Sequence, residues 1–298
     1  MGYGRFDRDT YRSYAASSGI AKARSASEIY TSSTVKECYL PKLVNRESCD
    51  SAEHPESTPI AIGLDVTGSM SRIIQLVAQT LGDMMDGLYK GGKVTDPQVL
   101  FAAIDDYIST STPLQVTQFE SDIRIAEQLK ELKFISRGGG NGWESYVLFW
   151  YFCARHTKLD CVTKHGKKGF LFTMGDDGYQ KSISPDELRD VFGDESTEGI
   201  STKALYDELC KKYEVFHICL SEGSTYRDRD FRDYQSLMGS HAIRLDHYEM
   251  LPEVITSVIR LYQGDTKTAI LADIDKEKLS TIEQILNNVK PDADLELI

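Results

Sequence analysis

The stretch Ile60-Ala-Ile-Gly-Leu-Asp-Val-Thr-Gly-Ser-Met70 decides how we expect this chain to fold. Five apolar or small residues lead into Asp65. An apolar run of this length that ends in Asp and Gly predicts a buried parallel strand followed by a loop. Apolar residues then recur at helical spacing from Ser71 to Tyr89, which predicts a helix after the loop. The stretch is therefore typical of a strand, a loop and a helix in an α/β fold.

The loop after this strand carries oxygen atoms that suit a metal ion. Asp65 is followed at alternate positions by the hydroxyl groups of Thr67 and Ser69. In open α/β sheets, ligands bind at the carboxyl ends of the strands, which is where this loop is expected. One carboxylate and two hydroxyls on a tight turn suit a hard divalent cation, above all Mg²⁺.

Strand and helix patterns alternate through the rest of the chain. We expect strands at 60–65, 98–104, 115–119, 168–174, 214–220 and 242–245. We expect helices at 70–89, 121–132, 143–157, 185–191, 202–212, 228–237 and 248–261. This alternation predicts a doubly wound α/β fold, with a six-stranded, mostly parallel sheet and helices on both faces. The second and third strands are joined too closely for a crossover helix, so one of them should be antiparallel and lie near an edge.

Composition divides the chain into three parts. Residues 1–57 are polar with balanced charge, and we expect an arm that wraps the domain or is partly disordered. Residues 58–263 form the α/β domain, and residues 264–298 form a tail with a short amphipathic helix. The apolar residues on one face of that helix are Leu279, Ile282, Leu286 and Val289. This stripe predicts docking back on the domain, with a partner helix as the alternative.

The overall composition excludes several classes of protein. The chain has 298 residues and a net charge of −12, which argues against non-specific binding to nucleic acid or to anionic membranes. It contains no apolar run long enough for a transmembrane helix and no secretory signal at its N-terminus. The six cysteines form no Cys-x-x-Cys pair and have no histidine at zinc spacing, which favours reduced thiols. We therefore expect a cytoplasmic protein rather than an extracellular adhesion protein.

Two further loops offer oxygen ligands near the ends of expected strands. The stretch 137–145 is rich in glycine, which permits a close approach of the backbone to a bound ion. The residues of this loop that could supply an oxygen are Asn141, Glu144 and Ser145. The other loop follows the strand at 168–174 and carries Asp176 and Asp177.

Together, strand-Asp-x-Thr-x-Ser-helix, a glycine-rich second loop and strand-Gly-Asp resemble a von Willebrand factor A (VWA) domain with its metal-ion-dependent adhesion site. The resemblance covers residues 58 to 263. The stretches 118–122 and 139–146 also resemble bacterial and phage proteins of this class with no assigned role. The resemblance implies a Rossmann-like VWA fold for this part of the chain.

The resemblance also implies a set of metal ligands. Thr67 and Ser69 would touch the metal, while Asp65 and Asp176 would act directly or through water. The family usually offers a threonine in its second loop, and this chain has none there. Two residues are the candidates for that ligand, Asn141 and Glu144.

The function implied by the resemblance is binding rather than catalysis. The metal, Mg²⁺ with Mn²⁺ or Ca²⁺ as alternatives, would present an open coordination position to an Asp or Glu of a partner protein. Such a contact is directional and is lost when the metal is chelated. The resemblance implies partners such as a ring-type ATPase or other components of an assembly.

A phosphatase is the main competing hypothesis. Asp65 after one strand, and Asp176 with Asp177 after another, resemble a haloacid-dehalogenase-type phosphohydrolase, in which the first Asp is the nucleophile and the last acidic pair holds Mg²⁺. That chemistry needs a carboxylate two residues after the nucleophile, where this chain has Thr67. The candidates for its phosphate-binding lysine are Lys164, Lys167 and Lys168.

A structural role is the third hypothesis. Asp and Ser are favoured at helix N-termini, so Asp65 and Ser69 could simply cap the helix that follows them. The chain would then be an assembly component with a vestigial metal site.

Overall fold

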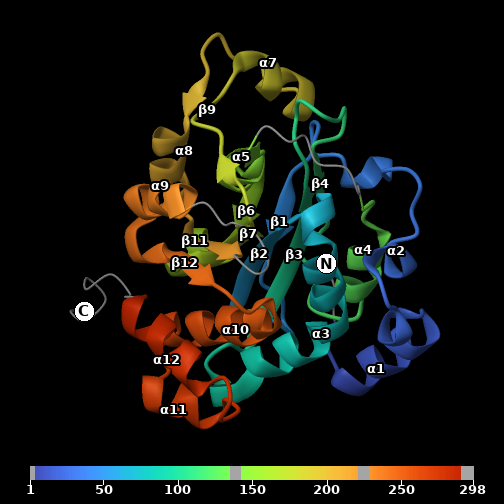
Figure 1. Cartoon of the computed structure of the whole chain (residues 1–298), viewed down its shortest axis with the longest axis vertical. Coiled ribbons are helices and arrows are strands. Elements are labelled where there is room, and N and C mark those ends of the chain that lie inside the picture. Colours follow the sequence, from blue (N-terminus) through green and yellow to red (C-terminus); the bar gives the residue numbers. More distant parts are fainter. Residues whose placement is uncertain (1–3, 135–141, 221–227, 290–298) are drawn as a thin grey trace.

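The computed structural model describes residues 4–134, 142–220 and 228–289. Its centre is a six-stranded sheet with the strand order β12-β11-β7-β2-β3-β4 (Figure 1). The strands are β2 (Ser57–Asp65), β3 (Asp96–Ile104), β4 (Leu114–Val116), β7 (Gly169–Gly175), β11 (Tyr213–Leu220) and β12 (Ala242–Leu245). All neighbours pair in parallel except β4, which lies antiparallel to β3 at one edge. The expected α/β class, the mostly parallel sheet and its one antiparallel strand are confirmed.

Helices connect most of these strands. They are α1 (Arg8–Ser17), α2 (Ala26–Ile29), α3 (Ser71–Tyr89), α4 (Arg124–Glu131), α5 (Tyr146–Arg155), α6 (Asp160–His165), α7 (Pro185–Glu187), α8 (Thr202–Leu209), α9 (Asp228–Met238), α10 (Leu251–Tyr262), α11 (Lys267–Ala272) and α12 (Leu279–Asn288). Short strands outside the main sheet are β1 (Arg46–Ser48), β5 (Trp143–Glu144), β6 (Thr157–Leu159), β8 (Gly178–Tyr179), β9 (Ser182–Ile183) and β10 (Ile200–Ser201).

Several elements begin or end up to three residues away from the expected boundaries. The strand expected at 115–119 ends at Val116, and the pairing resumes only as an isolated bridge between Val99 and Glu120. The helix expected at 185–191 is one turn of α-helix that continues as a π-helix over Leu188–Phe192. The helix expected at 143–157 begins at Tyr146, because the two residues before Ser145 pair as a strand with β8.

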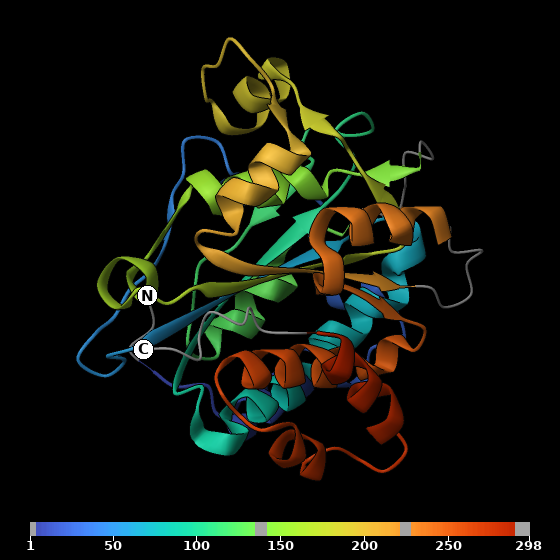
Figure 2. The same ribbon diagram turned by 90° about the vertical axis from the view of Figure 1, so that its left-hand side faces the viewer.

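The sheet separates two apolar clusters. Along β2, Ile60, Ile62 and Leu64 belong to one cluster, while Ala61 between them belongs to the other. This alternation follows from the period of two in a strand. Helices α3 and α10 pack in the first cluster, whereas α5 and α8 pack in the second. Figure 2 shows α5 and α8 above the sheet and α10 to α12 below it.

Strand β2 is the central element that positions the functional residues. All nine of its residues are buried, because β3 and β7 flank it and helices cover both its faces. A Cβ atom at Gly63 would lie 2.6 Å from the ring of Phe149, so glycine is needed there for α5 to approach the strand. This close packing holds the end of β2, and therefore Asp65, against the start of α5.

The N-terminal segment lies along the domain from residue 4 onward. Helix α1 packs on α3, where the Arg8 guanidinium binds Asp86 at 2.6 Å. Tyr30 donates a hydrogen bond of 3.2 Å to the Ile74 carbonyl, and β1 pairs in parallel with β6. These contacts explain how a segment of mainly polar sequence adopts defined helices.

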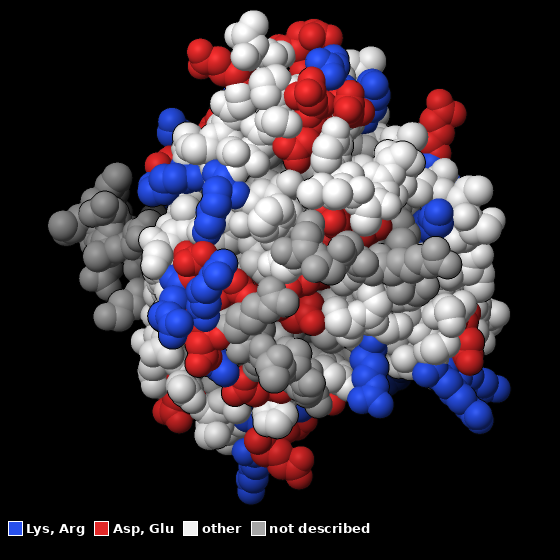
Figure 3. All heavy atoms as spheres, turned by 45° about the horizontal axis from the view of Figure 1, so that its top comes forward, with Lys and Arg blue, Asp and Glu red and all other residues white. Residues whose placement is uncertain are grey.

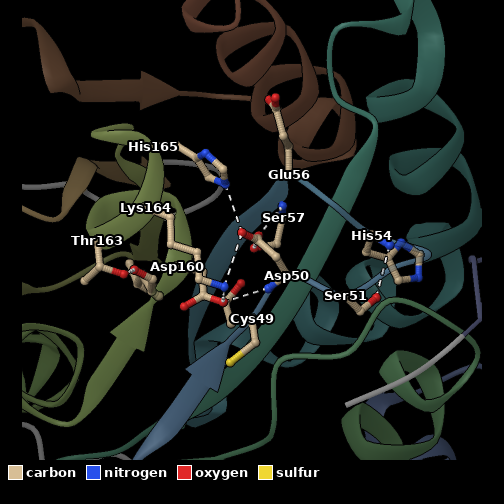
Figure 4. A network of polar contacts seen from close by, with 12 residues as sticks. Cys49, Asp50, Ser51, His54, Glu56, Ser57, Asp160, Thr163, Lys164 and His165 are labelled. Carbon is tan, nitrogen blue, oxygen red and sulfur yellow. Dashed lines mark hydrogen bonds and ion pairs between the residues drawn. The ribbon is translucent and has the colours of Figure 1, made fainter.

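A polar network joins this segment to the start of β2 (Figure 4). Asp50 Oδ1 accepts hydrogen bonds from the Ser57 amide at 3.0 Å and from its hydroxyl at 2.8 Å. Asp50 Oδ2 lies 2.9 Å from His165 Nε2, and the Asp50 amide donates to Asp160 in α6. The network lies at the amino end of the sheet, opposite the loop after Asp65.

The tail packs on α10. The side chains of Ile282, Leu286 and Val289 are buried in the same cluster as that helix. Arg260, buried in α10, binds Asp265 at 2.7 Å and Asp273 at 2.8 Å. In the part of the chain that the structure describes, no helix has the length and apolar character to cross a membrane.

Candidate functional site

Four loops meet at the carboxyl edge of the sheet. They follow β2, β3 and β7, and the fourth is the turn that leads into α5. Ser69 donates a hydrogen bond of 3.2 Å to Asp176, which joins the first of these loops to the third. The Tyr107 amide donates to Ser145 Oγ at 3.0 Å, and β5 pairs in parallel with β8. In Figure 3, where this end of the molecule is turned forward, carboxylate groups gather near the middle of the face.

Asp65 is held by hydrogen bonds at the end of β2. Its side chain is fully buried, and its Oδ1 atom accepts hydrogen bonds from the amide of Thr67 at 2.8 Å and from its hydroxyl at 2.6 Å. Its Oδ2 atom accepts one from the Tyr146 hydroxyl at 2.9 Å. Burial raises the pKa of Asp65 above its ordinary value, the hydrogen bonds from Thr67 oppose that rise, and the charge of Asp176 adds to it.

Ser69 and Asp176 complete a group of donors that come from two adjacent strands. Ser69 is exposed and Asp176 is partly exposed, so this part of the site faces solvent. A Cβ atom at Gly175 would overlap the Tyr146 hydroxyl and lie 3.1 Å from Asp65 Oδ2, so only glycine fits before Asp176. The structure thus brings together Asp65, Thr67, Ser69 and Asp176, all of which we expected at the site.

Glu144 faces the same edge from the turn before α5. It is 2% exposed, and its Oε2 atom has no hydrogen-bond partner among the described residues. Burial raises the pKa of Glu144 well above its usual range, and the charges of nearby carboxylates, first that of Asp65, raise it further. Of the two candidates for a second-loop ligand, Glu144 therefore lies beside the site, and Asn141 lies outside the described residues.

Two acidic residues that we did not single out also belong to this edge. Asp105 and Asp106 follow β3, which is the neighbour of β2 in the sheet, and both are buried. Asp105 Oδ2 has no hydrogen-bond partner in the described parts of the chain. Burial raises the pKa of Asp105 to about 6. The signal was present in the sequence, because an apolar strand ending in two aspartates is the same pattern as the strand before Asp176.

The oxygen donors at this edge suit a hard cation, and they are a mixture of carboxylates and hydroxyls. Within residues 4–134, 142–220 and 228–289, no group of three or more His, Cys, Asp or Glu side chains is arranged to hold a metal ion. The donors near Asp65 are instead two carboxylates and two hydroxyls. Buried carboxylate oxygens without partners, those of Glu144 and Asp105, lie beside them. Uncompensated buried carboxylates are costly, and a bound divalent cation would offset that cost.

The three lysines considered as phosphate ligands lie at the opposite end of the sheet from Asp65 and Asp176. Lys167 and Lys168 lie just before β7, at the opposite end of that strand from Asp176, where they bind Glu56 and Glu214. Lys164, in α6, binds Asp160 near the same end.

Comparisons with known proteins return structural neighbours at low identity. The pilus adhesin SpaC from Lactobacillus rhamnosus GG, in its open conformation, aligns over 78% of this chain and 31% of its own, with 12% identity and a TM-score of 0.46. Proximal thread matrix protein 1 from the mussel byssus aligns over 69% of this chain and 46% of its own, with 11% identity and a TM-score of 0.45. This chain therefore spans less than half the length of either protein. No protein-family model matches the chain, and no curated protein does.

Proposed function

We propose that this chain is a divalent-metal-dependent protein-binding module with a doubly wound, VWA-like fold. Its metal, Mg²⁺ in the first instance, would be held by Asp65, Thr67, Ser69 and Asp176. The observation that carries this proposal is the convergence of these four oxygen donors, through two hydrogen-bonded pairs, on one edge of the sheet. Carboxylates and hydroxyls are ligands for Mg²⁺, Mn²⁺ or Ca²⁺, and less so for softer metals.

Some residues around the site would hold the ion, and others would leave it accessible to a partner. Tyr146 and Thr67 fix both oxygens of Asp65, so this carboxylate needs little ordering when a cation binds. Ser69 lies at the exposed side, where a bound ion would keep a position open to solvent. When bound, the metal supplies a positive centre to which an oxygen atom of a partner protein can bind. No reaction of a substrate is required.

Reduced cysteines fit a cytoplasmic setting for this module. The six cysteines, three of them buried, all lie in the described parts of the chain, and none forms a disulfide bond there. Free thiols persist in reducing compartments, whereas secreted proteins usually pair them. We therefore retain the cytoplasm as the proposed location.

Titration of the metal alone tests the proposal. Isothermal titration of Mg²⁺ into the full chain, stripped of metal with EDTA, should show one site that Asp65→Asn and Asp176→Asn each weaken at least about tenfold. Asp207→Asn is the matched control, since Asp207 is an exposed acid that pairs with Lys203 in α8. Equal affinity in all four proteins would contradict the assignment of the ligands, and no measurable binding to the wild type would favour a vestigial site.

An activity assay separates binding from phosphate hydrolysis. We expect the full chain in Mg²⁺ to hydrolyse p-nitrophenyl phosphate no faster than Asp65→Asn does. Turnover by the wild type that disappears in this variant would support the phosphohydrolase instead, because only that mechanism uses Asp65 as a nucleophile.

A further inference from the structure

A groove runs beside β12, the strand at one edge of the main sheet. It has a volume of about 1050 Å³ and lies between α9, β12 and α12. In Figure 1, α9 lies above β12 and α12 lies below it. The strands β11 and β7 separate β12 from β2, so the groove lies apart from the candidate metal site. The lining residues used below are Phe231, Arg232, Ile243, Arg244, Ile285 and Val289.

The floor of the groove is the outer edge of β12. Among the described residues, β12 pairs with β11 alone. The backbone N–H and C=O groups of alternate residues in a strand point to opposite sides, so half of those in Ala242–Leu245 point away from β11. Another extended chain pairs with groups of this kind. The backbone chemistry of the floor therefore selects a β-strand as the occupant of the groove.

The two walls of the groove lie on opposite faces of the sheet. Helix α9 packs in the second apolar cluster, as Ala242 does, whereas α12 packs in the first cluster, as Ile243 does. Because side chains alternate along a strand, Arg244 lies on the α9 side, where it binds Asp228 of that helix at 3.0 Å. A strand added beside β12 would likewise place one set of alternate side chains against α9 and the other set against α12.

The α9 wall is basic, whereas the α12 wall has an apolar base. Arg232 is exposed and makes no ion pair within the described parts of the chain. Arg244 is also exposed, and it binds Asp246 at the rim of the groove at 3.4 Å. On the opposite wall, Ile285 and Val289 contribute aliphatic carbon. Carboxylates would therefore be favoured on one face of an added strand, and aliphatic side chains on the other.

We propose that this groove binds an extended segment of a partner protein, which adds to the sheet as a strand beside β12. The segment carries Asp or Glu at the alternate positions that face Arg232 and Arg244. Aliphatic residues stand between them and contact Ile285 and Val289. Hydrogen bonds between the two main chains provide affinity, and the alternating side chains provide specificity. This is a second interaction surface, and it does not depend on the proposed metal.

Binding of a designed peptide to the full chain, measured by fluorescence polarisation, tests the proposal. The probe is the labelled peptide Glu-Val-Glu-Val-Glu-Val-Glu. We expect it to bind at least about tenfold more tightly than the same peptide with Lys in place of Glu. The isomer Glu-Glu-Glu-Glu-Val-Val-Val, which has the same charge without the alternation, should be weaker by a similar factor of about ten.

Methylation of the peptide backbone tests the pairing with β12. Alternate N–H groups of a strand point to one side, so methylating the nitrogens of either the Glu or the Val set should abolish binding, while methylating the other set should not. Equal effects of the two methylated peptides would contradict strand addition.

Two substitutions in α9 provide a matched pair. Arg232→Ala should weaken binding of the Glu-Val peptide several-fold, whereas Arg229→Ala, exposed in the same helix and outside the groove, should leave it unchanged. The bound peptide should slow hydrogen exchange of the β12 amides and not of those in β4, at the other edge of the sheet. Equal effects of the two substitutions, or protection elsewhere in place of β12, would overturn the proposal.

Two other occupants of the groove would give different results. If the groove joined two copies of this chain, sedimentation would show a dimer that the peptide dissociates. If residues 290–298 of the chain itself bound there, the peptide would bind only to a variant that ends at Val289. Either result would overturn the assignment to a partner protein, and so would a failure of the peptide to bind both the full chain and that variant.

Discussion

The Tyr146 hydroxyl donates a hydrogen bond of 2.9 Å to Asp65 Oδ2, and both side chains are fully buried. Asp65 is the last residue of β2 and Tyr146 is the first of α5, so this one bond joins the central strand to the helix behind the site. The opposite oxygen of Asp65 accepts from Thr67. The carboxylate is therefore fixed from both sides before any ligand arrives.

We expect Asp65→Ala to be less stable than Asp65→Asn in EDTA. Asparagine keeps an oxygen acceptor at this position, whereas alanine leaves the buried donors of Tyr146 and Thr67 without one. A buried donor without a partner costs about 1–3 kcal/mol, so the free energies of unfolding should differ by about that amount. Urea denaturation measures the difference, and equal stabilities of the two variants would contradict the argument.

Gly175→Ala should disturb both the fold and the site. The new methyl group would overlap the Tyr146 hydroxyl, and forced overpacking of this kind costs about 1–3 kcal/mol. Tyr146→Phe removes the hydroxyl oxygen that the new methyl group would overlap. The double variant should therefore lose less unfolding free energy than the sum of the losses in the two single variants. Thermal or urea unfolding of the three variants gives the coupling, and strict additivity would argue against direct contact.

His217 should make the protein less stable in acid. Its ring is buried in β11, stacked 3.7 Å from the Tyr234 ring and 2.9 Å from the Thr173 hydroxyl, and burial lowers its pKa to about 3. The unfolded chain takes up a proton there below about pH 6.5, whereas the folded chain does not, so stability falls from about pH 6.5 towards pH 3.

His217→Gln isolates this effect from the other titrating groups. Between pH 7.5 and 5.5 the wild type should lose about 1.4 kcal/mol more unfolding free energy than the variant does. Urea titrations at the two values measure the losses. Equal losses of unfolding free energy in the two proteins would contradict this role of His217. The losses are compared, rather than the stabilities themselves, because we expect the variant to be less stable already at neutral pH.

The N-terminal segment should contribute to the stability of the whole domain. Ile29 is fully buried in the same apolar cluster as α3, and truncating a buried isoleucine to alanine costs about 2–5 kcal/mol. Ile108→Ala is the control, because that side chain is 70% exposed and its loss should change stability by less than about 0.5 kcal/mol. A similar small effect of both substitutions, measured in urea, would mean that the segment unfolds independently.

The sequence by itself determined the order of the main strands and helices. The run Ile60–Leu64 and the helical spacing from Ser71 to Tyr89 are local signals. They are reliable because the spacing of apolar residues in a strand or a helix is the same wherever that element packs. The same local pattern placed Thr67, Ser69 and Asp176 at strand ends. These residues converge because parallel strands share one carboxyl edge.

The sequence did not predict helix α1, and the reason is physical. Its mean composition is polar, and only Tyr11 and Ala15 are buried, so its apolar face is too narrow to stand out in the sequence. Its contacts with α3, including those of Arg8, join residues more than 70 positions apart. Tertiary packing, and not local propensity, stabilises a helix of this kind.

Only the tertiary structure decided which acids surround Asp65. The apolar periodicity of each strand does not predict the order of the strands in the sheet. The sequence therefore did not reveal that β3 lies beside β2 and brings Asp105 to the same edge. The pairing of β5 with β8 likewise places Glu144 there. The strand ends were a local property of the chain, whereas long-range pairing gathers at one edge acids that lie far apart in the sequence.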